Sequence, residues 1–188
     1  MAWRSSPRGS GARPCRSRRS VTESRQPREP DALILSTPEH LIAFGFGTGL
    51  ARKAPGTFGT LVGLPFYFAL HALPLPAYAL ACALLFVFGC WICGRSAHLL
   101  QVHDHGGIVF DEIVGFCIAA APLLVYPAVS AWWLLAVFAL FRFFDVLKPW
   151  PIRYFDEKLH GGFGIMFDDA LAGLASALLL WAALALVS

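Results

Sequence analysis

Three long stretches without a charged side chain divide the sequence, at residues 54–94, 113–141 and 170–188. The first two contain 41 and 29 residues, and proline-containing segments at 71–76 and 126–130 interrupt them. A helix needs about 20 apolar residues to cross a bilayer. The pattern therefore predicts an all-α protein, a polytopic membrane bundle of about five hydrophobic helices, of which the shorter ones would be tilted or would cross incompletely.

The first 30 residues follow a different pattern. They contain eight arginines and two glutamates, together with many Ser, Pro and Gly residues, and they show no apolar periodicity. Such a segment buries too little apolar surface to offset the entropy cost of ordering it. We therefore predict a disordered, Arg-rich tail at 1–30 and one membrane domain at 31–188.

The composition excludes an ordinary soluble domain. Hydrophobic residues make up 57% of the chain and charged residues only 14%, whereas soluble domains carry about a quarter charged residues. After position 30, seven basic side chains stand against ten acidic ones. The positive net charge of the whole chain thus belongs to the tail, and we expect no nucleic-acid partner.

The 17 charged residues after position 30 fall into three segments, at 31–53, 95–112 and 142–169. Counting the predicted spans places all three segments on the same side of the membrane, while the proline-containing turns carry no charge. Basic residues mark the cytoplasmic face of a membrane protein. We therefore expect the polar side of this domain to face the cytoplasm.

Acidic residues gather where apolar helices are expected to begin. Asp104, Asp111 and Glu112 precede or open the third predicted span, and Asp168 and Asp169 open the last one. The helix dipole favours acids at these ends, but only by about 1 kcal/mol, which is less than the cost of submerging two charges. An acidic cluster at a membrane surface suggests a bound divalent cation.

Basic residues lie close to these acids in the sequence. Arg142, Asp145 and Lys148 recur at three-residue spacing and share one helix face, which a chain of i,i+3 ion pairs would also explain. Two prolines follow Lys148, and we expect them to end the helix in an extended turn that carries Arg153 toward the same region. Three cations beside several acids would form a clamp for a phosphate group.

Glycine and threonine residues supply further candidates on the same side. Gly161, Gly162 and Gly164 would permit close backbone approach, and their amides could cradle phosphate oxygens. Thr57 and Thr60 could contact phosphate or metal, or they could cap the first span.

Four motifs in fixed order are similar to those of the phosphatidylglycerophosphatase A family: PGT at 55–57, Asp104 followed by IVFDE at 108–112, RFFDVLKP at 142–149, and GIMFDDALAG at 164–173. The resemblance covers roughly residues 36–188. It implies a multi-pass enzyme of the bacterial inner membrane, with its active site facing the cytoplasm. It also implies a Mg²⁺-dependent phosphatase whose phospholipid substrate, phosphatidylglycerophosphate, is converted to phosphatidylglycerol and phosphate.

The resemblance also implies roles for individual residues by matching position. The catalytic candidates are the acids Asp104, Asp111, Glu112, Asp145, Asp168 and Asp169, and all of these except Asp145 are candidate Mg²⁺ ligands. Arg142 and Lys148 are implied phosphate-binding residues, and the residues themselves add Arg153 and Thr57 as candidates for the same contact. His103 and His105 are interpreted equally well as proton donors or as polar residues of the membrane interface.

Two other functions remain open from the residues alone. A phosphotransferase that moves a phospho-alcohol onto a lipid also places acids at membrane helix ends, although it would show a denser pattern of Asp with Gly, Ala and Arg. A divalent-cation carrier would use intramembrane acids, but near the bilayer midplane and not at one face. For the phosphatase, attack by water and attack by a carboxylate are both consistent with the sequence.

Overall fold

The structure is a computed structural model that describes residues 31–102, 105–126 and 132–187. Every regular element within these ranges is a helix, so the predicted all-α class is confirmed for the described chain. The tail predicted to be disordered lies outside the described residues, as do His103 and Asp104.

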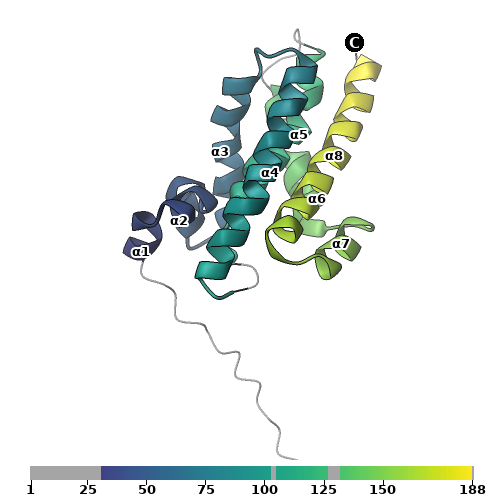
Figure 1. The fold of residues 1–188 in the computed structure, drawn as a ribbon. Helices are drawn as coiled ribbons and strands as arrows, with labels where there is room; N and C mark the ends of the chain where they lie inside the picture. Colours follow the sequence, from purple (N-terminus) through teal and green to yellow (C-terminus); the bar gives the residue numbers. More distant parts are fainter. Residues whose placement is uncertain (1–30, 103–104, 127–131, 188) are drawn as a thin grey trace, which may run out of the picture.

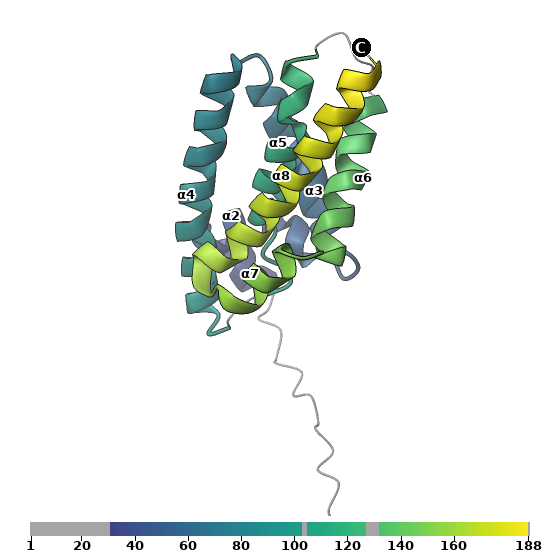
Figure 2. The ribbon, with the colours of Figure 1, turned by 90° about the vertical axis from the view of Figure 1, so that its right-hand side faces the viewer.

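Five helical segments run alongside one another and form the body of the molecule (Figures 1 and 2). They are α3 (Pro55–Leu70), α4 (Leu75–Leu99), α5 (Phe110–Ala120) with its 3₁₀ continuation η2 (Ala121–Leu124), α6 (Trp132–Leu147) and α8 (Gly161–Val187). Four short elements lie at the lower end of the bundle in Figure 1. They are α1 (Asp31–Ser36), α2 (Pro38–Ala43), η1 (Gly45–Leu50) and α7 (Ile152–Lys158).

Two of the described helices, α4 with 25 residues and α8 with 27, are long and apolar enough to cross a membrane. The helices α3 and α6 have 16 residues each. At 1.5 Å per residue such a helix extends about 24 Å, which is shorter than a hydrocarbon core of about 30 Å. The structure therefore supports a helical membrane protein. Among the described helices, α4 and α8 have the length for a complete span.

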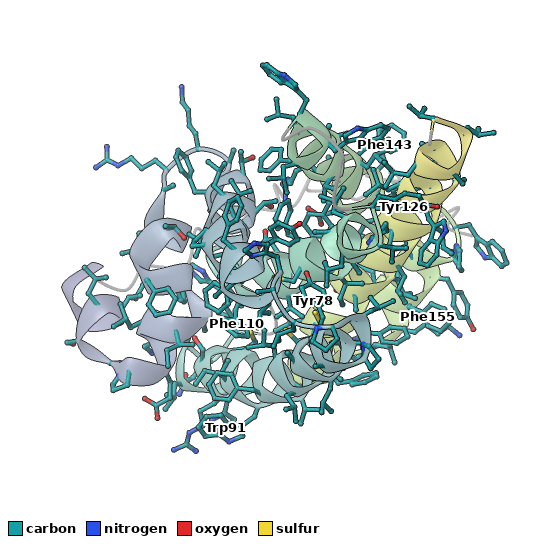
Figure 3. The ribbon with its side chains drawn as sticks, turned by 90° about the horizontal axis from the view of Figure 1, so that it is seen from above. Tyr78, Trp91, Phe110, Tyr126, Phe143 and Phe155 are labelled. Atoms are coloured by element: carbon teal, nitrogen blue, oxygen red, sulfur yellow. The ribbon has the colours of Figure 1, made fainter. Side chains whose placement is uncertain are left out.

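The interior of the bundle is apolar and closely packed around α5 and α8. Phe116 of α5, Phe141 of α6 and Leu180 of α8 are fully or almost fully buried in one cluster. The hydroxyl of Tyr78 donates a 2.6 Å hydrogen bond to the carbonyl oxygen of Cys117. Figure 3 shows Tyr78 within the bundle and Trp91, which is exposed, at its periphery.

The glycine-rich segment before the acids of the last helix forms the first turn of α8 and not a separate loop. A Cβ atom at Gly162 would overlap the carbonyl oxygen of Cys90 and lie 2.8 Å from the backbone nitrogen of Gly94. The missing side chain thus lets α8 cross α4 at backbone distance. The expected close approach is present, and it is made between two helices.

Replacing Gly162 with Val should therefore separate α4 from α8 and lower the stability of the protein. Forcing side-chain atoms into a packed contact typically costs about 1–3 kcal/mol, and more where backbone blocks the space. We expect a melting temperature in detergent several degrees below that of the wild type. Ala182→Val, which places the same side chain on an exposed face of α8, is the control. Equal melting temperatures for the two variants would contradict this packing role.

Candidate functional site

A polar pocket of about 210 Å³ lies where α5 begins and α6 ends, beside α7 and the first turns of α8. Seven of its lining residues are charged, six acids and one lysine: Asp111, Glu112, Asp145, Asp156, Asp168, Asp169 and Lys148. The apolar rim is formed by Ile108, Leu159 and Ile165, with Gly106 and Gly164. Residues from four separate segments of the sequence thus converge on one small polar space.

Three carboxylates form the centre of this pocket. Asp111 and Glu112 are the second and third residues of α5, and Asp169 lies in the third turn of α8. One oxygen atom from each of the three lies within 4.8 Å of the others. This is the one group of metal-ligand type found among the described residues, and it contains three of the acids predicted from the sequence.

A pair of glycines explains why these acids meet. Gly115 lies one turn after Glu112, and Gly173 lies one turn after Asp169. A Cβ atom at Gly173 would stand 2.5 Å from the carbonyl oxygen of Gly115. Because both positions lack side chains, α5 and α8 approach closely, and this approach brings the carboxylates of the two helices together.

Three acids of the pocket each have a buried oxygen atom that lacks a hydrogen-bond partner among the described residues. These atoms are Oε2 of Glu112, Oδ1 of Asp168 and Oδ2 of Asp169, whose residue is only 3% exposed. A buried carboxylate without a partner is strongly unfavourable. A hard divalent cation is the group that such oxygens bind, so the donor set fits Mg²⁺.

The backbone of α3 forms one wall around Glu112. A Cβ atom at Gly56 would overlap Oε1 of Glu112, and one at Gly59 would lie 3.1 Å from Oε2. The first turn of α3 thus contributes space and not a functional group. The functional candidate expected in this motif was Thr57, which does not line the pocket. Gly56 and Gly59 are three residues apart, and this spacing indicates a helix face that allows close approach of another group.

Arg142 lies behind the acidic centre. Its guanidinium pairs with Asp145, as the three-residue spacing predicted, and its Nη1 atom lies 3.7 Å from Oε1 of Glu112. Arg142 does not itself line the pocket, whereas Asp145 does. The structure therefore places Arg142 where it orients two carboxylates.

Lys148 is the cation that lines the pocket. Its Nζ atom donates to Oδ2 of Asp168 at 2.5 Å and to Oδ1 of Asp156 at 2.7 Å. Burial lowers the pKa of Lys148, but the hydrogen bonds and charges of these two acids outweigh it, so its pKa lies above the ordinary lysine value. The ammonium group therefore stays charged at neutral pH.

Two expectations about the segment after Lys148 require correction. The expected extended turn is wrong, because residues 152–158 form α7 with Pro151 at its N-cap. On this helix Arg153 is 74% exposed and pairs with Glu157 at 3.0 Å, so the structure does not bring it to the pocket. The same helix instead supplies Asp156, which lines the pocket. This residue was not among the candidates from the sequence, because one acid within a run of charged residues has no distinctive pattern.

His105 lies beside the site without lining it. Its Nδ1 atom accepts a 3.1 Å hydrogen bond from the amide of Gly107, and its ring lies 5.2 Å from that of Phe44. The structure thus gives His105 a role in shaping the loop before α5. His103 and Asp104, the other candidates in this loop, lie outside the described residues.

Comparison with known proteins adds independent findings. A family model described as phosphatidylglycerophosphatase A matches residues 41–184. A protein of Haemophilus influenzae named phosphatidylglycerophosphatase A is 49% identical over 151 residues, which cover 80% of this chain and 91% of that protein. A protein of Escherichia coli with the same name is 44% identical over 149 residues, covering 79% and 85% of the two chains.

A third relative, from Bacteroides thetaiotaomicron, carries a provisional name as a phosphatidylinositol-3-phosphatase. It is 40% identical over 148 residues, which cover 74% of this chain and 89% of the relative. No solved structure matches the chain.

The crowded carboxylates predict an unusual response to neutralisation. In EDTA, Asp169→Asn should raise the melting temperature by a few degrees, because it removes one of three buried negative charges while keeping the side-chain shape. Glu157→Gln, on the exposed surface of α7, should leave the melting temperature unchanged. A marked loss of stability in Asp169→Asn without metal would show that the charge is compensated within the protein.

Proposed function

The chain belongs to the phosphatidylglycerophosphatase A family, and from this premise we propose that it hydrolyses its lipid substrate with Mg²⁺ bound by Asp111, Glu112 and Asp169. Family membership makes the protein a phosphoric monoester hydrolase that acts on phosphatidylglycerophosphate. The products are phosphatidylglycerol and inorganic phosphate. Magnesium dependence and the cytoplasmic location of the site are the further parts of the proposal.

The observation that carries the metal proposal is the set of buried carboxylate oxygens without partners at the meeting point of α5 and α8. We propose Asp111, Glu112 and Asp169 as ligands, with Asp168 beside them, and Asp104 as a further candidate from the sequence. When bound, Mg²⁺ supplies positive charge that offsets the negative charge gathering on the phosphate oxygens during reaction.

Lys148 is the side chain best placed to bind the phosphate. An ammonium group has three protons, and hydrogen bonds to Asp156 and Asp168 use two of them. The third is available to a phosphate oxygen in the pocket. Arg142 acts at one remove by holding Glu112 and Asp145. We assign Arg153 and Thr57 no contact with the phosphate, since neither lines the pocket.

The reaction itself is a simple exchange at phosphorus. Overall, the bond between phosphorus and the terminal glycerol oxygen is replaced by a bond between phosphorus and the oxygen of water, whether water attacks directly or releases the phosphate from a carboxylate. The departing oxygen takes up a proton that comes in the balance from this water and becomes the hydroxyl of phosphatidylglycerol. Asp156 and Asp168 hold the ammonium group of Lys148 in place. Lys148 in turn keeps the phosphate at a fixed distance from the acids of the pocket.

The surroundings of the pocket fit a lipid substrate. Val146, Leu147 and Trp150 flank Lys148 in the sequence and are all strongly exposed, with Trp150 at 84%. Exposed apolar residues at this position suit contact with acyl chains or with the membrane interface. The headgroup can therefore reach the pocket while the acyl chains stay in the bilayer.

We further propose that all five long segments lie in the bacterial inner membrane. The three shorter ones would be accommodated by tilt or by local thinning of the bilayer. Arg52, Lys53 and Arg95 belong to the segments at the pocket end of the bundle, and the preference of basic residues for the cytoplasm supports a cytoplasmic location of the pocket.

Phosphate release from phosphatidylglycerophosphate in detergent micelles tests the enzymatic proposal. We expect turnover with Mg²⁺ and none in EDTA, and slower turnover of phosphatidic acid and of phosphatidylinositol 3-phosphate. Asp111→Asn and Asp168→Asn should each reduce turnover by at least about a hundredfold at saturating Mg²⁺, while Glu157→Gln retains it. Full turnover in EDTA, or in either pocket variant, would remove the metal or that residue from the mechanism.

Cysteine labelling of intact cells tests the orientation. In a Cys15→Ser background, a cysteine at Leu73, in the turn between α3 and α4, should react with a membrane-impermeant maleimide added outside. A cysteine at Glu157 on α7 should react only after permeabilisation. Both positions are exposed in the structure and lie at opposite ends of the bundle. The reverse labelling pattern would contradict the cytoplasmic location of the pocket.

A further inference from the structure

Lys148 is held in place by two carboxylates that come from two different helices. Asp168 belongs to α8 and its side chain is only 9% exposed, whereas Asp156 belongs to α7 and its side chain is 41% exposed. The ammonium group therefore lies between a deep acid and an acid at the rim of the pocket. This arrangement fixes its position more tightly than one ion pair would.

The backbone of Lys148 supports the same conclusion. The residue directly follows α6 and has a φ angle of 40°, in the left-handed region. A residue with a side chain adopts this region only at an energetic cost. Such conformations persist where surrounding contacts determine them and are common at functional sites. Here the contacts are the two acid pairs of the side chain.

We propose that Asp156 is a positioning residue for catalysis: it holds the Lys148 ammonium group at the rim of the pocket, with one proton directed at the substrate phosphate. This inference rests on the proposed function of the pocket. Without Asp156, the remaining partner is Asp168, and the ammonium group would be drawn inward onto that acid. The phosphate would then lose its cationic contact.

A purely structural role for Asp156 is less consistent with the packing of α7. Ile152 anchors this helix in the core, where it is 3% exposed. The ring of Phe155 also packs edge-on against Phe167 of α8, with 5.3 Å between centroids. These apolar contacts dock α7 without help from the Asp156 carboxylate, and an ion pair this exposed adds little to stability.

Asp156→Asn tests the proposal, with Glu157→Gln as the matched control. Glu157 is the next residue on the same helix and also pairs with a cation, Arg153, but it lies away from the pocket. We expect Asp156→Asn to raise the KM for phosphatidylglycerophosphate and the inhibition constant of inorganic phosphate about tenfold each, with a smaller change in kcat. Asp156→Glu should restore part of the loss. The melting temperatures of Asp156→Asn, Glu157→Gln and the wild type should be equal.

A double-mutant cycle shows whether Asp156 acts through Lys148. In a Lys148→Gln background, Asp156→Asn should cause little further loss in kcat/KM, because the group that it positions is gone. Full additivity of the two losses would overturn the proposal. So would an unchanged inhibition constant for phosphate in Asp156→Asn, a result that stands even if Lys148→Gln is too slow to measure. An inactive wild type would instead contradict the proposed function itself.

Discussion

Asp111, Glu112 and Asp169 bring carboxylate oxygens within 4.8 Å of one another at the point where α5 meets α8. Like charges at this separation repel, and burial weakens the screening by water. The glycines that let the two helices approach therefore bring together carboxylates that a positive charge would stabilise. The buried apolar cluster of the bundle stabilises the fold and offsets the repulsion between these carboxylates.

Arg142 and Lys148, the two basic residues at the site, have different roles. Arg142 stands behind the acids and pairs with Glu112 and Asp145, so its charge is largely used within the protein. Lys148 lines the pocket and shares its protons between Asp156 and Asp168. One cation thus organises the acids, and the other faces the space that a phosphate would enter. This division follows from the geometry of α6, which ends one residue before Lys148.

The hydrophobic pattern predicted the helical class and most of the acids that meet in the pocket, because apolar runs and charge placement are local properties. The sequence did not reveal how α7 would fold. Pro149 and Pro151 follow the end of α6, as predicted, but a proline also suits the start of a helix, and Pro151 stands at the N-cap of α7. Gly56 matters because the carboxylate of Glu112 packs against it, and Asp156 is distinguished only by its contact with Lys148. Both are tertiary relationships.

Binding of Mn²⁺, used as a paramagnetic substitute for Mg²⁺, tests whether the acids of α5 and α8 hold a metal ion. The free ion can be titrated by electron paramagnetic resonance against the purified full-length chain and against a Glu112→Gln, Asp169→Asn double variant. We expect saturable binding to the wild type that Mg²⁺ displaces, with phosphatase turnover rising over the same range of metal concentration, and loss of this binding in the double variant. Undiminished binding in a folded double variant would show that the metal is held elsewhere.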